Sequence, residues 1–519
     1  MFFTNYQSQA SFLEMQAKET QLMSLGKPRQ EFLYANLTTF MNSEKRKSML
    51  EAQRYYSNKP DILDRKRYYI DRQGTKVENT LLANSKLTHP FFRKLVKQKV
   101  NYILSKPYSF KSDNEEFVKK LEEVLGKKLY RKIKVVADEA IINGITWLQV
   151  YYDEMGELQF KRIPTEEVIP FWNDADHTDL DSLMRAYKVL RFNPDGSQET
   201  IMKVEYYSKQ GVWYFIEDGK GLKPDPDRPA GPQGNYTLAV PAVGVDGQPA
   251  MDANGQPIFQ ERGMRWEKIP FVAFKYNAEE MSLLQLIKAL IDDYDINASD
   301  TSNNLQDIPN SIKVVKGYDG TNKEEFTHNL AVFRTAFVNQ DGDMDTLETN
   351  LNIEAVDSHL NRLRRDIYEF ANGVNTQETD LGNASGVALK FRYADLDLDA
   401  DDLANEFSQA FEQLAWFVKT DLINRGEGDF MEEEFEVIFN TEGIINESEV
   451  ILDAKNSVGI ISDETILANH PWVTNAKEEM EKVTKQKEEA IAQMQALQGG
   501  EDYSAVGTTN NPNPDEPQE

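Results

Sequence analysis

The chain has 519 residues, of which 58 are basic and 86 acidic, so its formal net charge is −28; it contains no cysteine. Disulfides and thiolate metal sites are therefore excluded, and a protein that wraps nucleic acid is disfavoured, since counterion release needs clustered lysine and arginine. The length predicts two to four modules. We expect no signal peptide, because the first residues lack a basic segment followed by an apolar stretch. We expect no membrane span, because no run of about 18 apolar residues occurs.

The N-terminal third predicts helices followed by strands. Residues 1–50 are polar and mixed, and we expect helix in part. Residues 51–110 form a basic and aromatic block, whose last part predicts a helix with one apolar face formed by Phe92, Val96, Val100 and Ile103. Three lysines lie elsewhere on this helix: Lys94, Lys97 and Lys99. Lys106–Pro107 stops it, and a second helix is expected over about 114–143, ending at Gly144.

Strand signals follow this second helix. The segments ITWLQVYYD and ELQFKRIP predict two strands joined by a turn at 154–156, and further strands are expected near 184–193, 201–208 and 212–217. Residues 218–263 are rich in glycine and proline, which predicts an exposed excursion. A tolerated surface insertion is favoured for this excursion, and a long hairpin is the alternative.

Two helices then bracket a small mixed segment. The first is expected over 279–300, and SIKVVKGY at 311–318 predicts a strand. The second, over about 353–371, has apolar residues in steps of 3 and 4, the pattern of a heptad seam: Ile353, Val356, Leu360, Leu363, Ile367 and Phe370. Such a seam needs a neighbouring helix, either from the same subunit or from the next.

A polar loop at 374–386 leads into a long helical pattern over 387–425, stopped by Gly426. Its apolar positions are Leu403, Phe407, Phe411, Leu414, Val418 and Leu422. Such a helix would be roughly 60 Å long if unbroken. A strand at 434–440, a helix capped by Ser462 and a charged helix at 476–497 follow, and the composition of 498–519 predicts disorder.

The sequence contains no familiar catalytic constellation. Its five histidines are not at metal-ligand spacing, and it has neither a phosphate-binding loop nor a nucleophile elbow, so no cofactor is expected. Asp341, Asp343 and Asp345 begin like a calcium loop, but Thr346 and Asn352 break the pattern. A denser acidic cluster consists of Asp395, Asp397, Asp399, Asp401 and Asp402. A solvated helix face or an acidic ring around a pore is favoured for it over a two-metal nuclease.

Four blocks of the sequence, in this order, resemble the SPP1-type portal proteins of siphophages that infect Gram-positive bacteria. The first runs from Tyr55–Tyr56 through Asp61–Arg65, Tyr68–Ile70, Asn84 and His89 to VKQKVNYILSKPYSF. The others are LIKALIDDYDINASDTSNNLQDI, SIKVVKGYDG and GNASGVALKFRYADLDLDA, which resemble the first stem helix, the start of the clip, and the tunnel loop with the long wing helix. The resemblance covers about residues 45–480, and the 218–263 excursion departs from it.

The resemblance implies an α+β, mainly α, portal fold with crown, wing, stem and clip regions. The expected regions are an N-terminal segment (1–50), wing (51–278), first stem helix (279–308), clip (309–350), second stem helix (351–373), tunnel loop (374–386), long wing helix and wing strand (387–445), crown (446–497) and a disordered tail (498–519). It implies a structural protein and not an enzyme, because in this family ATP hydrolysis belongs to the terminase.

The implied function is a twelve-subunit ring at one capsid vertex of the virion, assembled in the host cytoplasm, through which double-stranded DNA passes. The implied partners are the terminase large subunit, the major capsid and scaffolding proteins and a head-completion adaptor. Lys313 and Lys316 are expected clip contacts. In the tunnel loop, Glu378 and Asp380 would repel DNA, while the other expected members are Thr376, Gln377, Thr379, Gly382, Asn383, Ser385 and Gly386. A metal-dependent nuclease using Asp395–Asp402 and a coiled-coil scaffold or adaptor are the alternative functions.

Overall fold

The computed structural model is α+β and roughly half helical, as the sequence predicted. It describes residues 29–70, 73–80, 82–153, 155–192, 196–229, 231–234, 236–241, 251, 259–307, 312–316, 343–347, 352–377, 386–439, 447–470, 472–473 and 476–498. The chain divides into two compact units, one of residues 1–381 and 391–442, the other of residues 382–390 and 443–519. In the described ranges, no helix has the length and apolar character needed to cross a membrane.

Two antiparallel sheets pack together in the first unit. One has the order β13-β4-β5, and the other has the order β10-β9-β8-β7-β6. Their strands are β4 (Ile145–Tyr152), β5 (Leu158–Ile163), β6 (Val168–Trp172), β7 (Leu180–Phe192), β8 (Gln198–Ser208), β9 (Gly211–Glu217), β10 (Leu222–Pro224) and β13 (Phe271–Lys275). Trp147 of one sheet stacks on Trp172 of the other, with 5.8 Å between ring centroids, so a shared apolar core joins the sheets.

The predicted strands near 145–163, 184–193, 201–208 and 212–217 are confirmed, but β6 and β13 were not predicted. Proline at 170 lowers the strand signal of β6, because proline cannot donate to a sheet ladder. The structure resolves this conflict by placing β6 at the edge of its sheet. The other described strand pairs are β1 (Tyr68–Ile70) with β2 (Lys76–Glu78), β3 (Ser109–Lys111) with β16 (Glu436–Ile438), β11 (Tyr236–Pro241) with β12 (Phe259–Met264), and β14 (Ile312–Lys316) with β15 (Asp343–Leu347).

The N-terminal helices cover these sheets. Helix α2 (Arg29–Met41) buries Phe32, Leu33 and Leu37 in the core of the five-stranded sheet. Helix α3 (Glu44–Tyr56) begins at Ser43, whose hydroxyl accepts a hydrogen bond from the Arg46 backbone N–H. The β11–β12 pair, which ends at Met264, shows that the 218–263 excursion contains a hairpin. The prediction of an exposed excursion is wrong at β10, which joins the five-stranded sheet and buries Leu222.

The single helix expected over 114–143 is wrong, because two helices occupy this range. They are α5 (Glu115–Leu125) and α6 (Lys127–Asn143), separated by Gly126. Both flanking sequences have helical periodicity, so an isolated glycine did not signal the break. The predicted end at Gly144 is confirmed: its φ is +84°, and a Cβ there would lie 2.0 Å from the Glu280 carbonyl oxygen.

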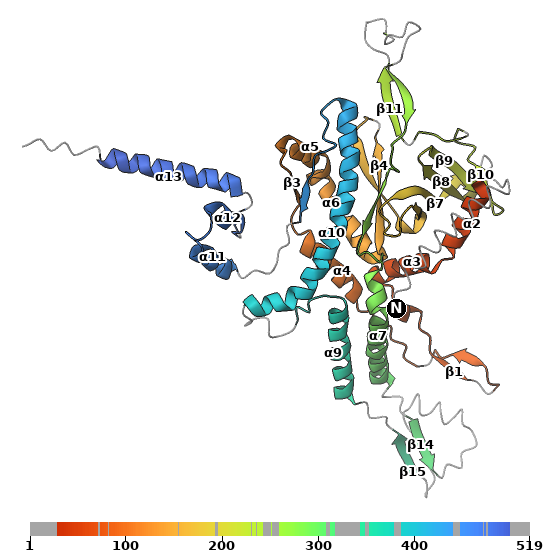
Figure 1. The fold of residues 1–519 in the computed structure, drawn as a ribbon. Helices are drawn as coiled ribbons and strands as arrows, with labels where there is room; N and C mark the ends of the chain where they lie inside the picture. The colour runs from red at the N-terminus through yellow and green to blue at the C-terminus, as the bar shows by residue number, and fades with distance from the viewer. Residues whose placement is uncertain are drawn as a thin grey trace, which may run out of the picture. The chain divides into compact units, whose positions relative to one another are not determined.

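Three long helices complete the first unit: α4 (Phe91–Ile103), α7 (Leu283–Asp307) and α9 (Ile353–Phe370). They share the main apolar core with α5, α6 and α10 (Gly386–Arg425), and α9 runs beside α7 (Figure 1). The long helix predicted over 387–425 is confirmed. All six of its predicted apolar positions from Leu403 to Leu422 are buried, and Gly426 follows it with a φ of +72°.

The second unit contains α11 (Glu447–Asn456), α12 (Asp463–Ala468) and α13 (Ala476–Gln498). The predicted cap is confirmed, since the Ser462 hydroxyl accepts from the Thr465 backbone N–H at 3.3 Å. Several large apolar side chains of this unit are exposed: Leu452, Val458, Ile460, Ile461, Trp472 and Ile491. The predicted disordered tail at 498–519 lies outside the described residues, apart from its first position.

Candidate functional site: a helix junction at the base of the 374–386 loop

Helix α4 is the centre of the junction. The predicted apolar face of Phe92, Val96, Val100 and Ile103 is buried, and Leu95 is buried with it. Lys99 is also buried, with 2% of its side chain exposed, so the interpretation of Lys99 as a residue outside the packed face is wrong. Gln98, Lys99 and Tyr102 instead contact the chain on both sides of the 374–386 loop.

Gln98 binds the chain just after α9. Its amide nitrogen donates to the Val374 carbonyl at 2.9 Å, and its amide oxygen accepts from the Val374 N–H at 3.0 Å. The preceding residue, Gly373, lies so close to α4 that a Cβ would fall 2.4 Å from Leu95 Cδ2. Glutamine satisfies both backbone groups of one residue, so the chain enters the loop at a fixed place.

The end of α9 is closed by its own backbone. Asn372 has a φ of +48°, in the left-handed region that asparagine tolerates. The N–H of Asn372 donates to the Glu369 carbonyl at 3.1 Å, and that of Gly373 donates to the Tyr368 carbonyl at 2.8 Å. These two bonds satisfy carbonyls that a helix end leaves free and turn the chain sharply toward α4.

Lys99 binds the chain after the loop. Its ammonium lies 2.7 Å from Asp399 Oδ2 on α10, and the other carboxylate oxygen accepts from the Tyr276 hydroxyl at 2.7 Å. Lys99 also donates to the Asn372 carbonyl at 3.4 Å. Burial lowers the pKa of Lys99, and the charge of Asp399 opposes this shift. One buried cation thus ties the end of α9 to α10.

Tyr102 completes the anchor. Its hydroxyl donates to Asp397, and its ring stacks on Tyr393 with 6.4 Å between centroids. It also packs against a small buried cluster of Val374, Tyr393 and Leu396. Val374, at the start of the loop, therefore meets the part of α10 from Tyr393 to Asp399 on one side of α4.

Helix α7 is clamped to the junction by an extended segment. The backbone N–H groups of Ser85, Leu87 and His89 donate to side chains of Asn303, Ser299 and Asp295, at 2.6, 3.0 and 3.1 Å respectively. Four helical residues rise about 6 Å and two extended residues span about 6.6 Å, so every second N–H meets every fourth side chain. Asp295, Ser299 and Asn303 are all buried.

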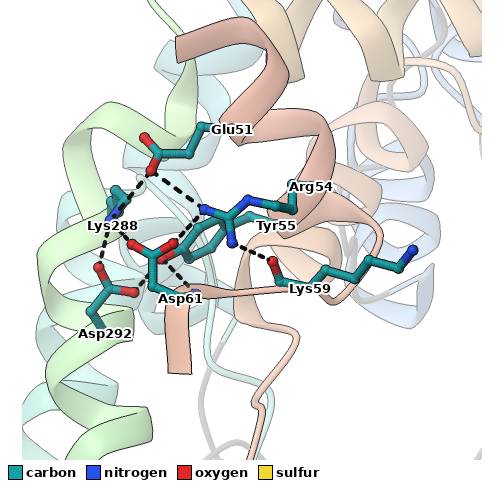
Figure 2. Close-up of polar contacts among 7 residues, drawn as sticks. All are labelled: Glu51, Arg54, Tyr55, Lys59, Asp61, Lys288 and Asp292. Carbon is teal, nitrogen blue, oxygen red and sulfur yellow. Dashed lines mark hydrogen bonds and ion pairs between the residues drawn. The ribbon is translucent and has the colours of Figure 1, made fainter. Parts of the chain in front are cut away.

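A charged network fixes the start of α7 (Figure 2). Lys288 lies 2.7 Å from both Asp61, on the short helix η1 (Asp61–Asp64), and Asp292, and 3.5 Å from Glu51 on α3. Arg54 pairs with Asp61, and the Tyr55 hydroxyl donates to Asp292. Burial tends to raise the pKa of Asp61, but hydrogen bonds from Lys288 and Arg54 outweigh it and lower the pKa to about 2.

The predicted heptad seam is only partly buried within one chain. Leu363 and Ile367 are buried where α9 packs against the rest of the main core. Val356 and Leu360 are half-buried, whereas Ile353 and Phe370 are 55% and 56% exposed. Near the junction the contact is aromatic, since Phe91 lies edge-on to Tyr294 of α7 and to Tyr368 of α9. The two end positions of the seam, Ile353 and Phe370, therefore remain available to a neighbour.

The other predicted site residues fall in three groups. Thr376 and Gln377 form a turn after α9, and Gly386 begins α10. Lys313 and Lys316 lie on β14, which pairs with β15. The remaining loop positions lie outside the described residues: Glu378, Thr379, Asp380, Gly382, Asn383 and Ser385.

The acidic cluster divides into two sets. Asp395, Asp401 and Asp402 are exposed, as a solvated helix face predicts. That interpretation is wrong for Asp397 and Asp399, which bind Tyr102 and Lys99. Among the described residues, no three His, Cys, Asp or Glu side chains are placed to hold a metal ion.

Comparison with known proteins agrees with the resemblance. The family described as phage portal protein, SPP1 Gp6-like, matches residues 41–493. The chain belongs to this family. It is 29% identical over 455 residues to the portal protein of Bacillus phage SPP1, covering 87% of this chain and 85% of the relative. It is 28% identical over 452 residues to the portal protein of Clostridium phage phiCD119, covering 84% and 92% respectively.

Sequence reasoning about this portal-family chain missed the residues that build the junction. Gln98, Lys99 and Tyr102 lie on a helix that was predicted, but their partners are about 275–300 positions away. The pattern Asp295, Ser299 and Asn303, with a step of four, was a usable signal, because three short polar residues on one helix face indicate a polar neighbour.

Proposed function

We propose that twelve copies of this chain form the portal ring at one vertex of a tailed-phage capsid, through which DNA enters and later leaves. Family membership supports this proposal, and the observation that carries it is the α4 junction. A loop that faces moving DNA needs a base that does not move with it. Gln98 holds the start of the loop at Val374, and Lys99 and Tyr102 hold α10 at Asp399 and Asp397, beyond the end of the loop, so these contacts can serve as a fixed base.

The regions take the following roles in this proposal. Helices α7 and α9 form the stem, the β14–β15 pair belongs to the clip, residues 374–386 form the tunnel loop, and α11 to α13 form the crown. The terminase large subunit and later a head-completion adaptor bind the clip, while capsid and scaffolding proteins surround the ring. Assembly takes place in the host cytoplasm, and the ring then stays in the virion.

The nuclease alternative is less well supported. A two-metal site needs free carboxylates from several directions, but Asp399 already binds Lys99 and Tyr276, and Asp397 binds Tyr102. The exposed acids of the cluster are left on a single helix. Metal-dependent cleavage of plasmid DNA by the purified protein would favour the nuclease over the portal.

The mass and shape of the purified particle test the ring directly. Twelve chains of 59.5 kDa give a particle of about 700 kDa. We expect native mass measurement to give this value and end-on electron micrographs to show a closed ring with a central channel. A monomer or dimer at every protein concentration and salt concentration contradicts the proposal.

The loop is tested by reversing its charge. Glu378→Lys combined with Asp380→Lys changes each subunit by four charge units, so a repulsive channel wall becomes attractive to DNA phosphates. We expect intact rings that slow or stall DNA movement, measured as nuclease-protected DNA in proheads supplied with terminase and ATP. A matched control is Glu199→Lys with Glu432→Lys, which makes the same charge change at two exposed positions. Normal protected DNA from the loop variant shows that the loop does not face the channel.

The clip is tested at β14. Lys313→Glu with Lys316→Glu reverses two charges on this strand and should leave ring formation intact, because both residues lie outside the stem and the junction. We expect reduced terminase binding to purified rings, measured by co-sedimentation, and less packaged DNA. Unchanged binding with both lysines reversed shows that they are not motor contacts.

A further inference from the structure

One stretch of this acidic chain is strongly basic. Residues 91–134 contain thirteen lysines and arginines but only five acidic residues, a local net charge of +8 in a chain of −28. This stretch covers α4, β3, α5 and the first half of α6. A charge opposite to that of the rest of the molecule indicates a surface that meets something acidic.

The cations gather on a surface made by α4 and α6. These two helices run antiparallel, because Lys97 binds Asp138 at 2.6 Å, while Lys134 binds Asn101 at 3.2 Å. The basic stripe is defined as Arg93 and Lys97 of α4 with Lys127, Arg131 and Lys134 of α6. Lys127 and Arg131 are exposed, and neither forms an ion pair with another residue of the described part of the chain. Val135, which is 41% exposed, adds an apolar side chain one turn from Arg131.

Helix α10 carries a second surface that the described part of the chain leaves exposed. The α10 stripe is defined as Phe391, Asp395, Leu398 and Asp402, whose steps of 4, 3 and 4 place them on one helix face. Phe391 is 79% exposed and Leu398 is 66% exposed. Alternation of large apolar and acidic residues on one face is the pattern of a helix that docks on an apolar surface with basic groups.

The two stripes cannot meet within one subunit. Helix α10 packs on α4 through Tyr393 and Leu396, so its exposed stripe faces away from α4. On α4, Lys99 points at α10, whereas Lys97 is turned by about 200° from it because it lies two residues away. The basic stripe and the α10 stripe therefore lie on different sides of the subunit. A contact between unlike surfaces of successive copies is the kind that closes into a ring.

We propose that the α10 stripe of one copy docks on the basic stripe of the next copy around the ring. This rests on the ring of the proposed function and names the surfaces that close it. Phe391 and Leu398 are then covered by the neighbour at Val135 and the aliphatic stems of the basic side chains. Asp395 and Asp402 face Lys127 and Arg131. A second copy fits better than DNA, because DNA would leave the exposed apolar side chains of Phe391 and Leu398 without a partner.

Charge reversal on the basic stripe tests the contact. In Lys127→Glu with Arg131→Glu, like charges face each other at every subunit contact. We expect the fraction of protein in closed rings at about 0.15 M salt to fall about tenfold, measured by native mass spectrometry. The matched control is Lys209→Glu with Lys220→Glu, which makes the same net charge change in two turns of the five-stranded sheet. This control should form rings like the unchanged protein.

A charge swap then identifies the partner surface. Asp395→Lys with Asp402→Lys should also lose rings, while the variant carrying all four changes should regain them, because opposite charges again face each other. The unfolding temperature of each monomer checks that the subunit still folds. Lys127→Gln with Arg131→Gln provides a milder test with an intermediate loss of rings.

Two results overturn the proposal. The first is that the Lys127→Glu, Arg131→Glu variant forms normal rings. If such rings differ only in how well they retain DNA, the basic stripe binds DNA and not a second copy. The second is that the charge swap does not restore rings, which means that the basic stripe contacts a surface other than the α10 stripe. Absence of rings in the unchanged protein is a separate outcome that contradicts the proposed function itself.

Discussion

The second half of helix α7 is held by buried polar side chains, whereas its neighbour α9 buries mainly apolar side chains, near one end. In α7, Asp295, Ser299 and Asn303 accept hydrogen bonds from one extended segment. In α9, burial is concentrated at Leu363, Ile367 and Tyr368, and Ile353 at the far end is largely exposed.

The difference concerns which helix positions are determined within one subunit and which depend on the neighbouring subunits. Hydrogen bonds from the backbone of the extended segment allow only one position of α7 along that segment, since a shift of one residue would leave buried polar groups unpaired. An apolar seam tolerates sliding and repacking more easily. Helix α7 therefore has its place within one chain, whereas the outer end of α9 at Ile353 leaves apolar surface that a neighbouring copy could cover.

The largest expected effect is at the buried part of α9. Leu363→Asp buries an unpaired charge and should cost about 3–5 kcal/mol per subunit. We expect soluble, partly folded monomer and no ring, measured by native mass and circular dichroism. The control is Ile353→Asp, where the side chain is 55% exposed, so the monomer should unfold at nearly the same temperature. A normal ring from Leu363→Asp would show that this position of α9 does not pack against another helix.

The next effect concerns the anchor at the end of α9. Lys99→Met leaves Asp399 without its buried cation and should destabilise the subunit by about 3 kcal/mol, measured by denaturant unfolding. Adding Asp399→Leu removes the uncompensated charge, so the double variant should regain most of this stability. If the single and double variants are equally unstable, Lys99 acts through packing and not through its charge.

Substitutions on the polar face of α7 should have graded effects. Asp295→Ala leaves the His89 N–H without its acceptor in a buried position and should cost about 2–3 kcal/mol. Ser299→Ala removes a neutral hydrogen bond to Leu87 and should cost about 1 kcal/mol. Hydrogen exchange at the His89 and Leu87 amides measures the clamp directly. Unchanged protection in both variants contradicts a clamp made by these side chains.

The smallest effect depends on pH. Asp61 has its pKa lowered to about 2, so its contribution to stability is present above the ordinary pKa of about 4 and is lost as the pH falls toward 2. Because 47% of this side chain is exposed, solvent screening keeps the contribution below about 1 kcal/mol.

The variant Asp61→Asn measures this contribution. The difference in unfolding temperature between the unchanged protein and Asp61→Asn should be constant from pH 7 to about 5 and shrink below about pH 4. Lys59→Gln is the control, because this side chain is exposed and Lys59 binds Arg54 through its backbone groups. A difference that does not change down to pH 3 removes Asp61 from the network that fixes the start of α7.

Local periodicity was sufficient to predict the elements whose neighbours are apolar. The long helix ending at Gly426, the heptad helix at 353–370, the first strands and the Ser462 cap all followed from patterns within a few residues. The spacing of apolar residues identifies the helix and the face it buries, so the sequence alone predicted these elements, although not how much of the seam one chain covers. The order of four blocks was likewise enough to indicate the family.

Only the tertiary structure decided which polar groups meet. The partners of Lys99 and Gln98 are 273–300 positions away, and the segment at 85–89, assigned to the wing, lies along α7. Gly126 breaks one predicted helix into two, and Pro170 sits in a strand at the edge of a sheet. Hydrogen bonds and ion pairs need distances and angles that only packing sets, so no spacing in the sequence revealed the junction that holds the loop.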